Sequence, residues 1–65
     1  MQIELNGAQI ETRATTLAEL IAEQEFEATS VATARNGAFV PQAARAQTDL
    51  VASDKIEVLS PMQGG

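Results

Sequence analysis

The segment MQIELNGAQIETR (residues 1–13) alternates apolar and polar residues on both sides of an Asn-Gly pair. Alternation with a period of two is typical of strands that are buried on one face. Asn6-Gly7 is a strong signal for a two-residue hairpin turn, because both residues tolerate positive φ angles. The segment therefore predicts a β-hairpin with strands over residues 1–6 and 8–13.

The hydrophobic period changes in the next segment, TLAELIAEQEF. Leu17, Leu20 and Ile21 follow the i, i+3, i+4 spacing that forms one apolar stripe on a helix. Thr16, with a Glu three residues later, matches the capping-box pattern and predicts a helix that ends near residue 25. A helix this short is not stable alone, so we expect it to pack against the hairpin.

The second half of the chain predicts three more strands and a short helical turn. The expected strands cover residues 31–36, 39–40 and 55–60, and the surface turn covers residues 42–48. Asn36-Gly37 predicts a second hairpin turn, and Pro41 ends the short strand. We expect Leu50 and Val51 to fill the core before a turn at Ser53-Asp54.

In the strand at residues 31–36, the small side chains of Ala32 and Ala34 share one face. Thr33 and Arg35 lie on the other face of this strand.

The order of these elements favours an α+β fold with a mixed sheet and one main helix across one face. The first and last strands are expected to lie parallel at the centre of the sheet. We predict a globular domain over residues 1–60 and a flexible tail over residues 61–65. Pro61 ends the last strand, and the two terminal glycines carry no side chains to pack.

The composition excludes several classes of site. The 65 residues include no Cys and no His, which excludes disulfides, zinc sites and iron–sulfur clusters, and we expect no metal site. A net charge of −5 would repel nucleic acid and anionic membranes and would steer a basic protein partner toward the surface. Without an apolar run long enough for a membrane span or an evident signal peptide, we expect a cytoplasmic protein.

The inventory of reactive side chains argues against catalysis. Beyond the missing His and Cys, the chain has a single lysine, Lys55. Glu23, Glu25 and Glu27 could supply a carboxylate pair, but a solvated helix end that aids solubility is the favoured interpretation. We therefore expect a protein with no catalytic residues, on which partner enzymes act.

The remaining candidate group is the carboxylate that follows Gly64 and Gly65. Glycines lack a Cβ, so they can pass through a narrow channel and leave the terminal carbonyl unhindered. The five residues after Ser60 extend at most about 16–18 Å, enough to reach a buried active site. Once activated as an acyl-adenylate by another enzyme, this carboxylate would be open to attack. The alternative is that the two glycines reflect a truncation or a coincidence.

Four stretches together resemble the sulfur carrier proteins of thiamin (thiazole) biosynthesis, a ubiquitin-like β-grasp family. They are MQIELNG, TTLAELI, NGAFVP and the closing DKIEVLSPMQGG, and the resemblance covers the whole chain. Two positions depart from the family pattern, because Ser53 stands where Gly is frequent and Gln42 where Arg is frequent. The first departure is expected to cost turn stability, and the second removes a basic contact.

The resemblance implies a cycle of activation and sulfur transfer. An E1-like adenylyltransferase would use ATP and magnesium to adenylate the Gly65 carboxylate, and sulfur would then replace AMP to form a thiocarboxylate. The sulfur would come indirectly from a cysteine desulfurase or another persulfide donor, and thiazole synthase would receive it. The protein itself would hold no cofactor.

The resemblance also assigns the site residues. Gly64 and Gly65 would form the sulfur-carrying terminus. The residues expected to support the tail and the docking of partners are Leu59, Ser60, Pro61, Met62 and Gln63.

The surface around this tail is expected to be the sheet face opposite the helix. We expect that face to carry Glu4, Arg35, Glu57 and Leu59. Leu59 either is exposed for a partner or packs against Phe39 or the tail, and Phe39 itself fits either the core or the surface.

Three alternative functions remain open. The small subunit of molybdopterin synthase uses the same fold and terminus for the molybdenum cofactor. A ubiquitin-like modifier would form isopeptide bonds with other proteins. An interaction module of the same fold would not use the tail at all.

Overall fold

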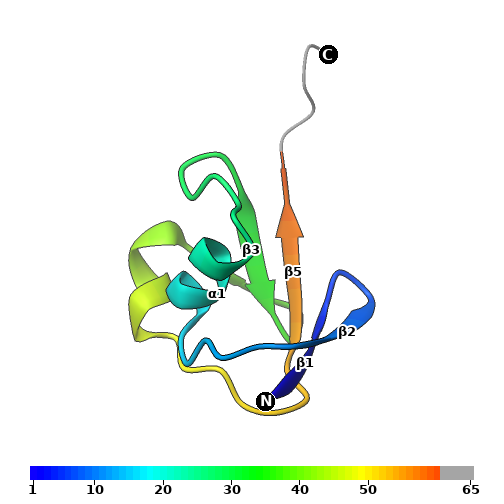
Figure 1. The fold of residues 1–65 in the computed structure, drawn as a ribbon. Coiled ribbons are helices and arrows are strands. Elements are labelled where there is room, and N and C mark those ends of the chain that lie inside the picture. Colours follow the sequence, from blue (N-terminus) through cyan, green and yellow to red (C-terminus); the bar gives the residue numbers. More distant parts are fainter. Residues whose placement is uncertain (61–65) are drawn as a thin grey trace.

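The computed structural model describes residues 1–60, and the predicted tail at residues 61–65 lies outside the described residues. A five-stranded mixed sheet in the order β2-β1-β5-β3-β4 is covered on one face by a helix and a 3₁₀ helix (Figure 1). The elements are β1 (Gln2–Leu5), β2 (Ala8–Glu11), α1 (Leu17–Glu23), β3 (Ala32–Arg35), β4 (Ala38–Val40), η1 (Gln42–Gln47) and β5 (Lys55–Leu59). This is the predicted α+β, ubiquitin-like β-grasp arrangement, with β1 and β5 parallel at the centre.

The opening hairpin is confirmed, with strands slightly shorter than predicted. β1 and β2 pair in antiparallel register from Gln2 opposite Glu11 to Leu5 opposite Ala8. The φ angles of Asn6 and Gly7 are 50° and 86°. Two successive positive φ angles match the right-handed twist of the strands, which explains why the Asn-Gly pair forms this turn.

Helix α1 is also confirmed, but its cap differs from the predicted box. The side chain of Thr16 accepts a hydrogen bond from the backbone N–H of Glu19 at 3.2 Å, as predicted. The Glu19 carboxylate, however, bonds the backbone N–H and the hydroxyl of Thr15 rather than the N–H of Thr16. The helix ends at Glu23 instead of near residue 25, because Glu25 takes a φ of 62°, which a right-handed helix cannot include.

The pairing of β3 with β5 corrects the predicted open face of the sheet. Arg35 lies opposite Ile56 in this antiparallel pair, and cross-strand partners share a face. Because Ile56 is buried under the helix, Arg35 belongs to the inner face and not to the open one. The prediction that grouped Arg35 with Glu57 was therefore wrong.

The hydrophobic core lies between α1 and the inner face of the sheet. It consists of Ile3, Leu5, Ala14, Leu17, Leu20, Ile21, Val40, Leu50, Ile56 and Val58. Leu50 is buried as predicted, but Val51 is 56% exposed, so the prediction that it fills the core was wrong. The backbone N–H of Val51 donates to the carboxylate of Asp54 at 2.8 Å, and the resulting turn carries the Val51 side chain outward.

The helical turn predicted after Pro41 is present as η1, but one of its residues is not on the surface. Arg45 is only 4% exposed and lies beneath η1, between this element and the sheet. No described helix is long and apolar enough to span a membrane.

Candidate functional site

Strand β5 leads directly to the predicted site. Its last residue, Leu59, is 66% exposed, and the next residue, Ser60, is also exposed. The other predicted site residues, Pro61, Met62, Gln63, Gly64 and Gly65, lie outside the described residues. The structure therefore fixes the base of the site and the direction in which β5 approaches it (Figure 1).

The open face of the sheet carries an exposed apolar strip beside this base. On this face Ala32 lies opposite Leu59, and Ala34 lies opposite Phe39. Phe39 is 69% exposed, so it is a surface residue, and neither Phe39 nor Leu59 is buried by the other. Of the two interpretations offered by the sequence, the exposed Leu59 is the one that the structure supports.

Acidic residues accompany the apolar strip on the same face. Glu57 lies opposite Ala34, and Glu4 is paired with Lys55 across β1 and β5. Glu4 and Glu57 were both predicted on the open face, and the alternation along β1 and β5 places them there, since their neighbours Leu5 and Ile56 are buried. The surface beside the site is therefore apolar with an acidic border.

A shallow depression lies at the point where β5 ends. It is lined by Thr29, Ser30, Val31, Ala32, Leu59 and Ser60. The loop before β3 thus forms one wall of the depression, and the end of β5 forms the other. Sequence reasoning missed this wall, because residues 29–31 carry no motif.

The end of β5 is held from both sides. On one side, β3 pairs with it as far as Ala32 opposite Leu59. On the other side, the side-chain amide of Asn6 bonds both backbone groups of Val58, at 2.9 Å to its N–H and 3.2 Å to its carbonyl. The sequence indicated the turn at Asn6 but not this second role.

The beginning of β5 is fixed by a buried carboxylate, Asp54. Its oxygens accept hydrogen bonds from Arg35 Nε at 2.8 Å, Asn36 Nδ2 at 3.0 Å and the Val51 backbone N–H at 2.8 Å. Burial acts to raise the pKa of Asp54, but the hydrogen bonds from Arg35, Asn36 and Val51 outweigh it and hold the pKa below its ordinary value. This cluster fixes the starting point of the strand that leads to the site.

The acidic cluster that begins with the last residue of α1 has a structural role at this first member, Glu23. Both carboxylate oxygens of Glu23 are engaged, one by the hydroxyl of Thr12 and the other by the backbone N–H of Arg13. These hydrogen bonds, that of Thr12 first, lower the pKa of Glu23. The carboxylate ties the end of α1 to the chain after β2. Hydrogen bonds from Thr12 and Arg13 hold the Glu23 carboxylate, and not a proton shared with a second carboxylate as in a catalytic pair.

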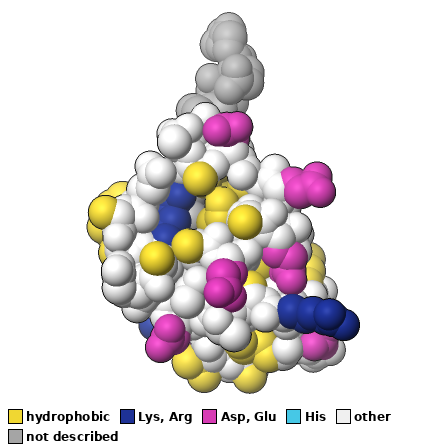
Figure 2. Space-filling model, turned by 60° about the vertical axis from the view of Figure 1, so that its left-hand side comes forward, with side chains coloured by type: hydrophobic (Ala, Val, Ile, Leu, Met, Phe, Trp, Pro, Cys, Tyr) yellow, Lys and Arg dark blue, Asp and Glu magenta, His cyan; other side chains and the backbone are white. Residues whose placement is uncertain are grey.

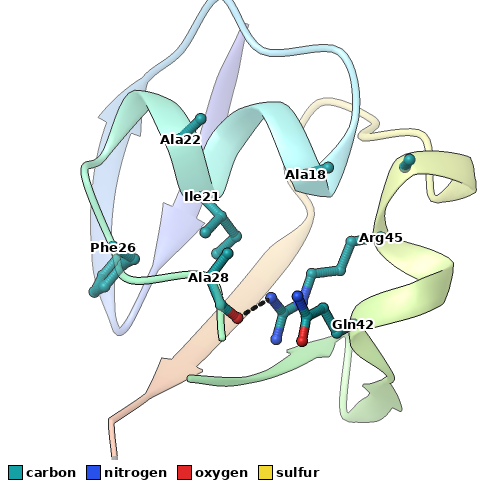
Figure 3. Close-up of a pocket in the computed structure, with 8 residues that line it drawn as sticks. Ala18, Ile21, Ala22, Phe26, Ala28, Gln42 and Arg45 are labelled. Carbon is teal, nitrogen blue, oxygen red and sulfur yellow. Dashed lines mark hydrogen bonds between the residues drawn. The ribbon is translucent and has the colours of Figure 1, made fainter. Parts of the chain in front are cut away.

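A second feature, a pocket of about 280 Å³, lies between α1 and η1. Figure 2 shows it as a hollow with hydrophobic side chains around it and basic atoms at its floor. Its residues are Ala18, Ile21, Ala22, Phe26, Ala28, Gln42, Arg45 and Ala46. Figure 3 shows that the Arg45 side chain reaches from η1 to the loop after α1, where it donates to the carbonyl of Ala28 at 2.8 Å. Sequence reasoning missed this residue, because one Arg in an alanine-rich turn looks like a surface cation.

Comparisons with known proteins agree with this fold and indicate a family. The model of the ThiS family matches residues 2–65 of the chain. The crystal structure of a thiamine biosynthesis protein (ThiS) from Geobacter metallireducens superimposes with a TM-score of 0.86 at 25% sequence identity, and the match covers 100% of both chains. No curated protein sequence matches at a significant level.

Proposed function

The chain belongs to the ThiS family, whose members carry sulfur for thiamin biosynthesis, and on that premise we propose that its working group is the carboxylate of Gly65. An E1-like adenylyltransferase would couple this carboxylate to the α-phosphate of ATP, with magnesium, and release pyrophosphate. Sulfide would attack the acyl carbon and displace AMP, which leaves a thiocarboxylate on Gly65. With a persulfide as the donor, the attack would form an acyl persulfide and displace AMP, and a thiol would then cleave its sulfur–sulfur bond, which releases the thiocarboxylate and forms a disulfide. Thiazole synthase would accept this sulfur, and a cysteine desulfurase or another persulfide donor would supply it.

One observation supports this proposal more than any other: central strand β5 ends at an exposed Leu59, six residues before the terminal glycine. Within residues 1–60, the last residue of the hydrophobic core is Val58. A partner enzyme can therefore act on the following segment without opening the core. This division between a packed body and a reactive end is what a carrier requires.

The apolar strip on the open face supports the docking half of the proposal. Phe39 and Leu59 offer exposed apolar surface on the open face, and Glu57 lies in the same cross-strand row as Phe39, because both are aligned with Ala34. Exposed apolar groups with a charged border are typical of recognition surfaces. We propose that the adenylyltransferase and thiazole synthase contact this strip while Ser60 and residues 61–65 enter the active site. We place the cycle in the cytoplasm, where ATP is available.

The test is an intact mass measurement of the full chain. The protein is incubated with the adenylyltransferase of its own organism, Mg-ATP and sodium sulfide. We expect a mass increase equal to the exchange of one oxygen for one sulfur, which is absent without ATP and absent after deletion of Gly64 and Gly65. The deletion variant should melt within about 2 °C of the parent chain, because every core residue in the described part of the chain precedes residue 59.

Three outcomes would contradict the proposal in different ways. An unchanged mass, with an adenylyltransferase that is active on another carrier, would mean that Gly65 is not the acceptor. A stable adduct with other proteins in place of the thiocarboxylate would favour a ubiquitin-like modifier. Retention of molybdopterin synthase large subunit instead of thiazole synthase by the immobilised chain would assign the same chemistry to the molybdenum pathway.

A further inference from the structure

The side-chain amide of Asn6 forms a pair of hydrogen bonds with the main chain of Val58, 52 residues away in the sequence. The Val58 N–H donates to Asn6 Oδ1 at 2.9 Å, and Asn6 Nδ2 donates to the Val58 carbonyl at 3.2 Å. A paired donor and acceptor in this arrangement is what a neighbouring strand residue would supply. The amide of Asn6 therefore substitutes for one more residue of β1.

The sheet needs this substitution because β5 is longer than the strand beside it. Successive residues of a strand direct their backbone groups to alternate sides, so Ile56 and Val58 both face β1. The backbone N–H of Asn6 still bonds the Ile56 carbonyl at 2.9 Å, but the chain then turns away at Gly7. Figure 1 shows that β5 continues past this hairpin turn toward the C-terminal end. Without the Asn6 amide, no other described group would pair with Val58 on that side.

The second Asn-Gly turn provides an internal comparison. Asn36 has a φ of 51°, close to the 50° of Asn6, and it also bonds β5 through its side chain. Its Oδ1 accepts from the N–H of Lys55 at 2.9 Å, and its own N–H donates to the Lys55 carbonyl at 2.7 Å. The two asparagines thus hold opposite ends of the same strand. Of the two asparagines, only Asn6 bonds the end of β5 that leads to Leu59 and Ser60.

We propose that Asn6 is a positioning residue for the end of β5, Leu59 and Ser60. By fixing Val58, it orders Leu59 and Ser60 before a partner binds and sets the direction in which the chain leaves the sheet. Ordering a segment in advance lowers the entropy that binding must remove. This inference rests on the proposed function, because it assigns to Asn6 a contribution to recognition by the adenylating enzyme.

Three variants of the full chain separate positioning from simple stabilisation. Asn6→Gly keeps the positive φ of the turn and removes the amide, whereas Asn6→Asp keeps the acceptor for the Val58 N–H and loses the donor. Asn36→Gly is the matched control, with the same substitution in the same kind of turn.

Amide hydrogen exchange is measured at Val58 and at Glu57, whose backbone groups face β3. Pyrophosphate release by the adenylyltransferase gives KM and kcat for each carrier.

We expect Asn6→Gly to speed exchange at Val58 but not at Glu57. We expect it to raise KM for the carrier about ten-fold with kcat unchanged, since ten-fold lies within the entropic cost of ordering the backbone of a single residue. Asn6→Asp should recover much of the protection at Val58 and part of the KM. Asn36→Gly should lower the melting temperature but keep KM within about two-fold of the parent value.

The inference is overturned if Asn6→Gly and Asn36→Gly raise KM equally, because Asn6 would then act only through stability. Unchanged exchange at Val58 in Asn6→Gly would overturn it as well. If the parent chain itself is not adenylated, the proposed function fails, and the role of Asn6 in recognition fails with it. The exchange data would still show whether Asn6 holds the end of β5.

Discussion

Nε of Arg45 lies 3.1 Å from Oγ1 of Thr33 and donates a hydrogen bond to it inside the protein. The Thr33 hydroxyl donates in turn to the carbonyl of Val40 at 2.7 Å. The two other guanidinium nitrogens donate to the carbonyls of Ala28 at 2.8 Å and Val31 at 2.7 Å. The Arg45 side chain therefore connects η1 to β3 and to the loop before β3, and the Thr33 hydroxyl extends this connection to β4.

We predict that Arg45→Lys destabilises the protein by about 1–3 kcal/mol. A single ammonium group on a flexible stem cannot donate in the three directions that the planar guanidinium serves, so buried carbonyls lose their partners. Urea denaturation measures the change. Arg13→Lys is the control at an exposed position and should stay within about 0.5 kcal/mol of the parent. Equal effects of the two substitutions would refute the structural role of Arg45.

Ser53 occupies a backbone conformation that favours glycine, with a φ of 75°. We predict that Ser53→Gly stabilises the protein by about 0.5–1 kcal/mol, since the relief of left-handed strain exceeds the extra entropy of glycine in the unfolded chain.

Gly37 has a similar backbone conformation, with a φ of 85°. Gly37→Ala makes the opposite change, from glycine to a residue with a Cβ, and should destabilise the protein by about 1 kcal/mol. Beyond its chain neighbours, no atom lies within 4 Å of the position that a methyl group would take at Gly37, so the backbone alone determines that result. Thermal melts of both variants test the pair.

The elements of the fold were predictable because their signals are local. The Asn-Gly turn at Asn6 and the helix cap at Thr16 each depend on residues close in sequence, and the structure confirms both. The buried roles of Arg45 and Asp54 were not predictable, because their partners lie in other elements of the sheet or in distant loops. The wrong assignment of Val51 has the same origin, since a hydrogen bond to Asp54 decides the direction of its side chain.

For the candidate site, the chemistry assigned to Gly65 stays a prediction, and the surroundings of the site were only partly predictable from the sequence. The sequence pointed to Gly65 and to the exposure of Leu59 as one of two possibilities. It could not choose between those possibilities, because the exposure of Leu59 depends on how β3 and β4 align beside β5. The bond from Asn6 to Val58 was equally inaccessible, because no local pattern relates residues 52 positions apart.

Stability should decrease in acid because three carboxylates have lowered pKa values. The hydrogen bonds from Thr15 lower the pKa of Glu19 and those from Thr12 and Arg13 lower that of Glu23, from ordinary values of 4.5. In Asp54, hydrogen bonds overcome burial and lower the pKa from 3.8. The unfolded chain therefore binds more protons than the folded one at low pH, so the free energy of unfolding falls as pH falls.

We expect urea midpoints to be nearly constant between pH 7 and about pH 5 and to decline below about pH 4.5, as these groups become protonated. Asp54→Asn should lower the free energy of unfolding at pH 7 by about 1–3 kcal/mol, and the urea midpoint should fall with it. The variant should also lose less stability in acid than the parent chain. A variant that retains the full acid dependence of the parent would show that Asp54 contributes nothing to it.

The exposed apolar strip on the sheet makes the docking proposal testable without disturbing the fold. Leu59→Ser and Phe39→Ser remove side chains that are 66% and 69% exposed, so the free energy of unfolding should change by no more than about 0.5 kcal/mol. If a partner buries these groups, each substitution removes about 1–2 kcal/mol of apolar contact and raises KM for the carrier about five- to thirty-fold in adenylation.

Val51→Ser is the matched control for these substitutions, because Val51 is 56% exposed but lies before the start of β5, at the other end of the strand from Leu59. Its KM should equal that of the parent chain. A similar rise in all three variants would show a general effect of lost hydrophobicity, and no rise in any of them would exclude the strip as the docking surface. A rise confined to Leu59→Ser and Phe39→Ser would place the partner on the open face, beside the end of β5 from which the last residues reach the enzyme.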